Sequence, residues 1–132
     1  MLNPDGLSVL HTITNPRGEL NDPWIDKYIF PGGFIPQVAA TTKVMEAHGF
    51  ELQDYENLRY HYALTLDEWL RRFEAHRQEV VAMYDKRFYR MWRLYLANSA
   101  SGCRYGPMTL SQFVFTKGAH PDLPLTREHI YT

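Results

Sequence analysis

Several features that quickly assign a protein to a functional class are scarce in this sequence. Cys103 is the only cysteine among 132 residues, so an internal disulfide is excluded and a reducing, cytoplasmic compartment is expected. The formal net charge is −1, which argues against a general nucleic-acid-binding protein. The N-terminus has no basic segment followed by an apolar run, and no apolar stretch is long enough to cross a bilayer. We therefore expect neither a signal peptide nor a transmembrane helix.

Motifs for phosphate and metal binding are also missing. No G-x-G-x-x-G turn follows a predicted strand, and Gly32-Gly33 follows Pro31 instead. The histidines show no H-E-x-x-H spacing and no paired cysteines accompany them, so no metal site is expected. The composition is 45% hydrophobic, 22% charged and 14% aromatic. These fractions are typical of a globular domain that buries large apolar contacts.

The order of secondary structure predicts an α/β fold with a small sheet. Alternating or β-branched segments bounded by turn residues predict three strands, at Leu7–Thr14, Phe50–Leu58 and Met108–Lys117. Three strands alone would leave an exposed sheet edge, which is a liability for a soluble protein. The inventory therefore has the appearance of half of a larger domain.

Helical segments are predicted between the strands. One or two turns are expected in Trp24–Phe30, and a helix is expected from Pro36 to about His48, ended by Gly49. Thr65 and Glu68 form a capping box that predicts the start of the next helix. Apolar residues then keep helical spacing as far as Leu96. That length predicts a break near Asp85, with Gly102 and Gly106-Pro107 ending the second long helix.

A dozen short blocks, in this order and at these spacings, resemble the C-terminal portion of cyclopropane-fatty-acyl-phospholipid synthases and their relatives, the mycolic acid cyclopropane synthases. The resemblance extends from about Leu2 to Lys117. The blocks include Leu10-His11-Thr12-Ile13, Asp22-Pro23-Trp24-Ile25, Lys27-Tyr28-Ile29-Phe30-Pro31-Gly32-Gly33, Glu56-Asn57-Leu58-Arg59, His61-Tyr62, Thr65-Leu66 with Trp69, and Arg90-Met91-Trp92-Arg93.

The resemblance implies a class I S-adenosylmethionine-dependent methyltransferase (Rossmann-like) fold. Residues 1–118 would be the C-terminal part of that domain, and 119–132 a flexible tail. The three strands would be the fifth, sixth and seventh, with the seventh inserted antiparallel between the other two, and the long helices would cap the lipid site. The family's glycine-rich cofactor turn has no counterpart here, so no cofactor-binding residue is assigned and most of the S-adenosylmethionine pocket is expected to be missing.

The resemblance also implies a set of site residues. In the family, an alkene attacks the methyl group of the sulfonium, and a bound bicarbonate ion accepts the proton that leaves. By position, His11, Tyr62 and the backbone of Ile13 would hold that ion, whereas the family's glutamate and cysteine ligands have no counterpart. Cys103 is not that cysteine. Thr14 stands where the family has glycine.

Contacts with the acyl chain are implied for Tyr28, Phe30, Gly33 and Trp69. Taken alone, a histidine such as His11 on an apolar strand is more often structural, and these aromatic residues are more often core. The basic run Lys86-Arg87, Arg90 and Arg93 is either a solvated helix face or a surface near anionic headgroups.

Three hypotheses follow. The first is the C-terminal part of a synthase that transfers a methyl(ene) group from S-adenosylmethionine to the double bond of an unsaturated phospholipid acyl chain. Such a chain would be peripherally membrane-associated, and inactive without an N-terminal half. It could be a fragment of a longer enzyme, a subunit with a separate N-terminal partner, or an inert remnant. The second hypothesis is a lipid-binding or dimerising module that uses the sheet edge. The third is a methyltransferase with another acceptor, because this fold accepts many substrates.

Overall fold

A three-stranded antiparallel sheet organises the chain. The computed structural model describes residues 2–3, 6–18, 22–119 and 122–128. Strands β1 (Leu7–Thr14), β2 (Phe50–Asn57) and β3 (Thr109–Lys117) lie in the order β1-β3-β2, and β3 is antiparallel to both neighbours. The predicted insertion of the last strand between the other two is confirmed, and the predicted strand bounds differ by one residue at Leu58 and at Met108.

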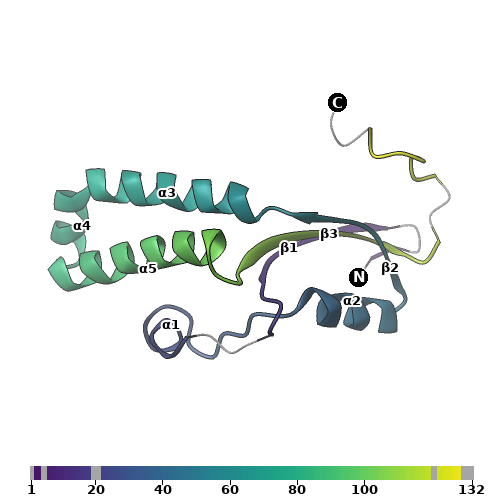
Figure 1. The fold of residues 1–132 in the computed structure, drawn as a ribbon, viewed down its shortest axis with the longest axis horizontal. Helices are drawn as coiled ribbons and strands as arrows, with labels where there is room; N and C mark the ends of the chain where they lie inside the picture. Colours follow the sequence, from purple (N-terminus) through teal and green to yellow (C-terminus); the bar gives the residue numbers. More distant parts are fainter. Residues whose placement is uncertain (1, 4–5, 19–21, 120–121, 129–132) are drawn as a thin grey trace.

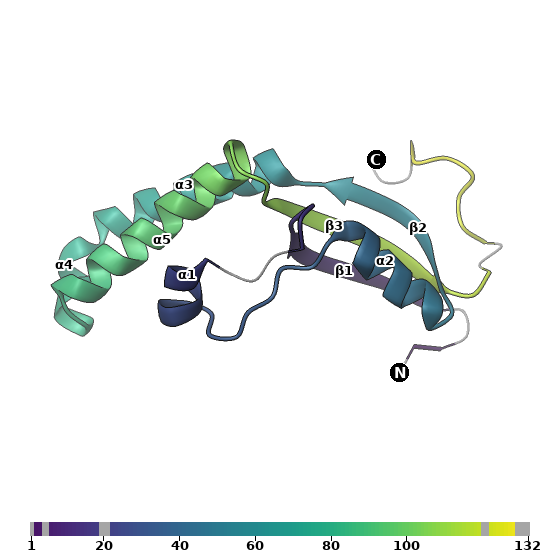
Figure 2. The ribbon, with the colours of Figure 1, turned by 60° about the horizontal axis from the view of Figure 1, so that its bottom comes forward.

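The described residues form five helices in addition to the sheet: α1 (Pro23–Tyr28), α2 (Val38–Ala47), α3 (Arg59–Ala75), α4 (Arg77–Met83) and α5 (Lys86–Arg104). Figures 1 and 2 show α3 and α5 side by side as a hairpin that extends from one end of the sheet and is closed by α4. Helix α2 lies along the sheet and packs against β2, and α1 lies apart from the sheet, near α5.

The two faces of the sheet differ sharply in burial. Phe113 and Phe115 are stacked on one face and are fully buried. Their register partners on the outer strands include Leu10 and Tyr55. The opposite face carries Leu7 and Val9, whose side chains are 52% and 58% exposed. Because side chains alternate along a strand, this sheet is covered on one face and open on the other.

A second core lies inside the helical hairpin. It consists of five buried residues from α3 and α5: Ala63, Leu66, Leu96, Ala100 and Cys103. Ion pairs join the two helices on the outside, from Arg104 to Asp67 and from Arg93 to Glu74. The hairpin therefore has its own apolar seam, which holds the helices that project beyond the sheet.

The first two helices begin within two residues of the sequence-based expectation, at Pro23 and Val38, but the third begins earlier than expected. Helix α3 begins at Arg59 and not at Thr65, because the Asn57 side chain accepts a hydrogen bond from the Arg59 backbone N–H at 3.0 Å. Thr65 lies inside the helix, where its hydroxyl donates to the His61 carbonyl. The capping-box prediction was therefore wrong.

The later part of the helical region is closer to expectation. The predicted break near Asp85 is confirmed, and the Asp85 side chain caps α5 by accepting from the Phe88 backbone N–H. A second break at His76 separates α3 from α4. Gly102 does not end α5, which continues to Arg104. In the described ranges, no helix combines the length and apolar character needed to cross a membrane.

Part of the predicted flexible tail, 119–132, falls outside the described residues. In the part that is described, Arg127 forms an ion pair with Asp54 of β2, with 2.7 Å between Nε and Oδ2. The flexibility of the tail stays a prediction.

Candidate functional site

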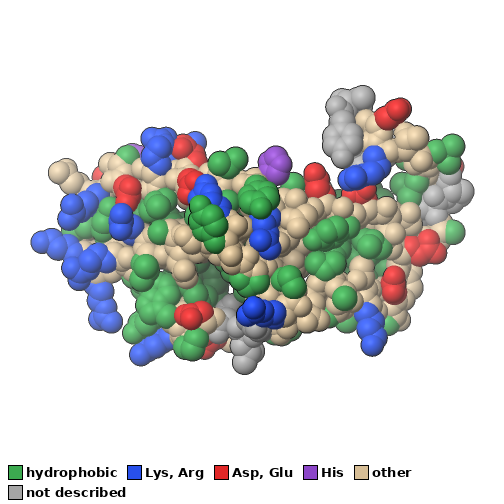
Figure 3. All heavy atoms as spheres, viewed as in Figure 1, with side chains coloured by type: hydrophobic (Ala, Val, Ile, Leu, Met, Phe, Trp, Pro, Cys, Tyr) green, Lys and Arg blue, Asp and Glu red, His purple; other side chains and the backbone are tan. Residues whose placement is uncertain are grey.

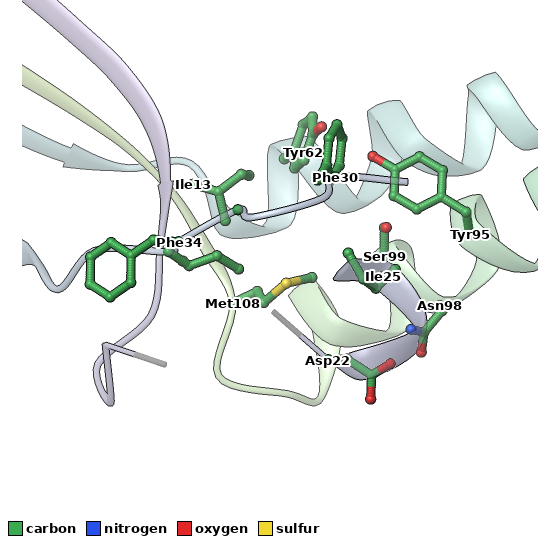
Figure 4. A pocket seen from close by; sticks show the side chains of 12 residues that line it. Ile13, Asp22, Ile25, Phe30, Phe34, Tyr62, Tyr95, Asn98, Ser99 and Met108 are labelled. Carbon is green, nitrogen blue, oxygen red and sulfur yellow. The ribbon is translucent and has the colours of Figure 1, made fainter. Parts of the chain in front are cut away.

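An apolar cavity of about 380 Å³ lies where β1 ends and the α3–α5 hairpin begins. Its apolar lining comes from Ile13, Ile25, Phe30, Phe34, Ile35 and Met108, and its polar lining from Asp22, Tyr62, Tyr95, Asn98 and Ser99. Figure 4 shows Ile13, Ile25, Phe30, Tyr62, Tyr95 and Met108 gathered around this space, whereas the Phe34 ring lies at its margin. A mostly apolar pocket with a few polar groups is the usual form of a small-molecule site.

The segment after α1 forms one wall of the cavity, and its turn is held by specific hydrogen bonds. The Asp26 carboxylate accepts from the Gly32 backbone N–H at 2.8 Å, and Gly33 N–H donates to the Phe30 carbonyl at 3.0 Å. Gly32 has φ 72°, a conformation that strongly favours glycine. The turn places the Phe30 ring edge-on to Tyr95, with 5.9 Å between the ring centroids. Gly33 lines the cavity beside it.

Two tyrosine hydroxyls lie in this apolar cavity. Burial raises the pKa of Tyr62 above its ordinary value, and proximity to Tyr95 and to Cys103 acts in the same direction. Burial also raises the pKa of Tyr95, although the nearby Ser99 hydroxyl partly opposes it. Among the described residues, none forms a hydrogen bond with the Tyr62 hydroxyl. Both phenols therefore remain neutral donors at ordinary pH, and the Tyr62 donor is available to a ligand.

These pKa shifts give a testable prediction. Because burial disfavours the phenolate, Tyr62 and Tyr95 should ionise at higher pH than an ordinary tyrosine. In an alkaline titration followed by ultraviolet absorbance, Tyr62→Phe and Tyr95→Phe should each remove part of the latest phase. The late phase should also disappear in urea, where the cavity is lost. A late phase that survives both substitutions would contradict this description of the cavity.

Of the three residues expected to hold an anion, two line the cavity and one does not. Ile13 and Tyr62 both line the cavity, whereas the His11 side chain is exposed and lies outside the cavity lining. His11 stands two positions before Ile13 on β1, so both side chains are on the open face of the sheet. Lys117 N–H donates to the Gly6 carbonyl, which makes the even-numbered residues of β1 the ones bonded to β3. The backbone N–H of Ile13 therefore points to the open edge of β1.

The four residues expected to contact an acyl chain also divide. Phe30 and Gly33 line the cavity. Trp69 is 47% exposed and packs edge-on against Tyr62 from outside the cavity, at 6.0 Å between ring centroids. Tyr28 lies in a second hollow, of about 310 Å³, lined by Trp24, Tyr28, Arg87, Arg90, Met91 and Leu94. This hollow is called the aromatic–basic groove below.

Several cavity residues were not singled out from the sequence. Tyr95, Asn98 and Ser99 follow the i, i+3, i+4 spacing that puts side chains on one face of α5. That spacing is visible in the sequence, but by itself it does not distinguish a cavity wall from the helix core, and Asn98 and Ser99 belong to no recognised motif. Met108 enters the cavity from the loop before β3, and no sequence pattern marks it.

The cavity does not have the character of a nucleoside site. Its polar groups are few, and among the described residues no glycine-rich turn leads from a strand into a helix. An adenosyl cofactor needs such backbone donors and several partners for its hydroxyl and amino groups. The residues present fit an apolar chain and do not form a pocket for S-adenosylmethionine. Within the described residues, no cluster of His, Cys, Asp or Glu is able to hold a metal ion.

Comparison with known proteins places this geometry in a class. The chain superimposes on the cyclopropane synthase MmaA2 from Mycobacterium tuberculosis with a TM-score of 0.81 and 31% identity, covering 88% of this chain and 46% of that one. A second solved structure, the mycolic acid cyclopropane synthase CmaA1 complexed with SAH and CTAB, gives a TM-score of 0.78 at 31% identity, covering 86% and 45%. The fold is thus the C-terminal part of a Rossmann-like methyltransferase domain.

The family is equally clear from the sequence comparisons. The family model described as mycolic acid cyclopropane synthetase matches residues 1–113, and the chain belongs to this family. The cyclopropane-fatty-acyl-phospholipid synthase of Escherichia coli strain K12 is 39% identical over 127 residues. That match covers 96% of this chain and 33% of the relative, so the chain spans about a third of the length of this curated relative.

Proposed function

We propose that this chain is the acyl-chain-facing, C-terminal part of a cyclopropane-fatty-acid synthase-type methyltransferase. The assembled enzyme would transfer a methyl(ene) group from S-adenosylmethionine to the double bond of an unsaturated phospholipid acyl chain. The observation that carries the proposal is the apolar cavity with the Tyr62 donor inside it, in a chain 39% identical to a named synthase. Family membership and the SAH complex of CmaA1 support S-adenosylmethionine as the methyl donor.

The cavity would bind the acyl chain and exclude water from it. Ile25, Phe30 and Met108 supply apolar surface, and burying a hydrocarbon chain against such surface is favourable by roughly 25 cal/mol per Å². A dry site is needed because water would capture the electron-poor carbon formed when the alkene is alkylated. The rings of Phe30 and Tyr95 would face that carbon with their electron-rich surfaces.

The tyrosine and the end of β1 would position the base. The Tyr62 hydroxyl has no hydrogen-bond partner among the described residues, and the Ile13 backbone N–H points away from β3. Both donors suit a small oxyanion such as bicarbonate. His11 would complete the set from the open face of β1. A bicarbonate ion held there would supply the base for the departing proton. The chain's own part is to hold the ion by neutral or charge-assisted hydrogen bonds, because an unpaired buried anion is costly.

The remaining part of the catalytic domain would have to supply the cofactor pocket. The relative from Escherichia coli has about two thirds of its length outside the match, and the residues described here fit no nucleoside. We propose that this part is supplied either in one continuous polypeptide or by an N-terminal partner. Peripheral contact with the membrane would follow from the proposed phospholipid substrate, and the single cysteine favours a reducing, cytoplasmic compartment.

Complementation tests the proposal. The purified chain is titrated with S-adenosylhomocysteine, alone and with a separately expressed N-terminal part of a related synthase. In parallel, the same samples are incubated with S-adenosylmethionine and vesicles of unsaturated phospholipid, and the lipids are analysed for ring formation. We expect cofactor binding and cyclopropanated lipid only in the mixture. Tight binding by the chain alone would contradict the account of the cofactor pocket. A well-folded chain that is silent in both samples would favour a module that binds lipid or dimerises without catalysis.

A further inference from the structure

The aromatic–basic groove lies next to the candidate cavity but is separated from it by α1. Asp22 and Ile25 of the α1 segment line the cavity, whereas Trp24 and Tyr28 line the groove. Trp24 and Tyr28 are four residues apart and pack together, with 5.8 Å between their ring centroids. One short helix therefore presents one side to each hollow.

Helix α5 connects the two hollows in the same manner. Arg87, Arg90 and Leu94 line the groove, and Tyr95 and Ser99 line the cavity one turn further along. Leu94 and Tyr95 are adjacent in sequence. The two hollows therefore lie along the same helix, one turn apart.

The arginines that line the groove differ from several others on the hairpin. Arg71 and Arg72 pair with Glu68, Arg93 pairs with Glu74, and Arg104 pairs with Asp67. By contrast, Arg87 and Arg90 are exposed and make no ion pair with any other described residue. Figure 3 shows Lys and Arg side chains gathered at the end of the hairpin that carries α4, beside a hydrophobic group over α1.

The combination of residues has a recognisable chemistry. Two arginines three residues apart on a helix are neighbours, and guanidinium groups bind phosphate oxygens in a forked geometry. Lys27 adds a third cation, because its Nζ lies 5.1 Å from the centre of the Tyr28 ring. Tryptophan and tyrosine prefer the boundary between water and lipid, where one end of the ring system is apolar and the other is wet.

We propose that the aromatic–basic groove is the surface by which this protein docks on an anionic phospholipid bilayer, with Arg87 and Arg90 on headgroup phosphates and Trp24 and Tyr28 at the interface. The bilayer is favoured as the occupant by charge complementarity and by the position of the groove beside the apolar cavity, on the other side of α1. The proposal rests on the proposed function for its lipid partner. It adds to that function the place on the surface where the bilayer would be met.

Vesicle binding tests this docking surface without any methyl transfer. The purified chain is co-sedimented with phosphatidylcholine vesicles that contain or lack phosphatidylglycerol, at low and at high salt. Each arginine near an anionic bilayer contributes about fivefold in affinity, so the double variant Arg87→Gln/Arg90→Gln should bind the anionic vesicles about thirtyfold more weakly at low salt. Both side chains are exposed, and the variant should keep the helical circular dichroism of the parent.

A matched control has the same net charge. Arg71→Gln/Arg72→Gln removes two arginines from α3, where both are already paired with Glu68, and it should bind nearly as tightly as the parent. The inference is overturned if both variants lose affinity equally, or if the parent binds neutral vesicles as well as anionic ones. Arginine-dependent vesicle binding without ring formation in the complementation experiment would retain this inference and remove the proposed function. Ring formation without arginine-dependent binding would do the reverse.

Discussion

Tyr62→Phe should lower ring formation by the complemented enzyme on the order of 100-fold, within the range by which positioned proton-transfer groups accelerate reactions. The substitution removes one oxygen and leaves the ring that packs edge-on against Trp69. The hydroxyl is the polar atom of α3 that lines the cavity, and its raised pKa keeps it protonated as a donor. The measurement is the initial rate of cyclopropane lipid formation at saturating cofactor and lipid.

Tyr60→Phe is the matched control for this experiment. It makes the same chemical change two residues earlier on α3, at a side chain that is 67% exposed and outside the cavity lining. Its rate should stay close to that of the parent. If the two variants have equal rates, Tyr62 does not hold the base, and the role of the cavity is limited to binding the acyl chain.

Phe113→Ala should lower the free energy of unfolding of the chain by about 3–5 kcal/mol. Phe113 is fully buried in the middle of β3, between the register partners Leu10 and Tyr55. It also stacks on Phe115. Removing the ring loses its buried apolar contacts and leaves a cavity on the covered face of the sheet. Urea unfolding followed by circular dichroism gives the difference between variant and parent.

The same substitution at an exposed ring supplies the comparison. Phe34 is 60% exposed, so Phe34→Ala should change the unfolding free energy by less than about 1 kcal/mol. A loss below about 1 kcal/mol for Phe113→Ala as well would mean that the sheet contributes little to stability and that the hairpin core folds by itself.

The sheet was predictable from the sequence largely because of the resemblance. Alternation alone located three strands, but no local pattern places β3 between β1 and β2. The order β1-β3-β2 is a long-range property, and it entered through the blocks of residues shared with a known family. The break before α5 was predictable locally, because Asp85 supplies a capping side chain.

The start of α3 shows why a local motif can mislead. Thr65 and Glu68 have the spacing of a capping box, but the helix is already formed when the chain reaches them. A threonine hydroxyl inside a helix donates to the carbonyl four residues earlier, as Thr65 does to His61. Leu58 is the N-cap residue instead, and Asn57 at the end of β2 supports this start by accepting a hydrogen bond from the Arg59 backbone N–H. Only the end of the preceding strand distinguishes these two possibilities.

Part of the candidate site was predictable because the resemblance links blocks that lie far apart in sequence. Ile13, Phe30, Gly33 and Tyr62, from three separate blocks, are brought together in one cavity. Tyr28 does not line this cavity, because its ring lies on the opposite side of α1 and lines the aromatic–basic groove. The short distance in sequence between Tyr28 and Phe30 does not predict that their rings point to different sides. The roles assigned to these residues stay predictions.

The open edge of β1 affects how easily this protein would aggregate in a cell. Its outward backbone groups and the exposed Leu7 and Val9 side chains form a template onto which another extended segment can add. A copy whose β1 edge is uncovered would therefore be prone to strand addition with a second copy, and such copies would become clients of chaperones and proteases. Expression of residues 1–132 by themselves would then yield more aggregated than folded protein.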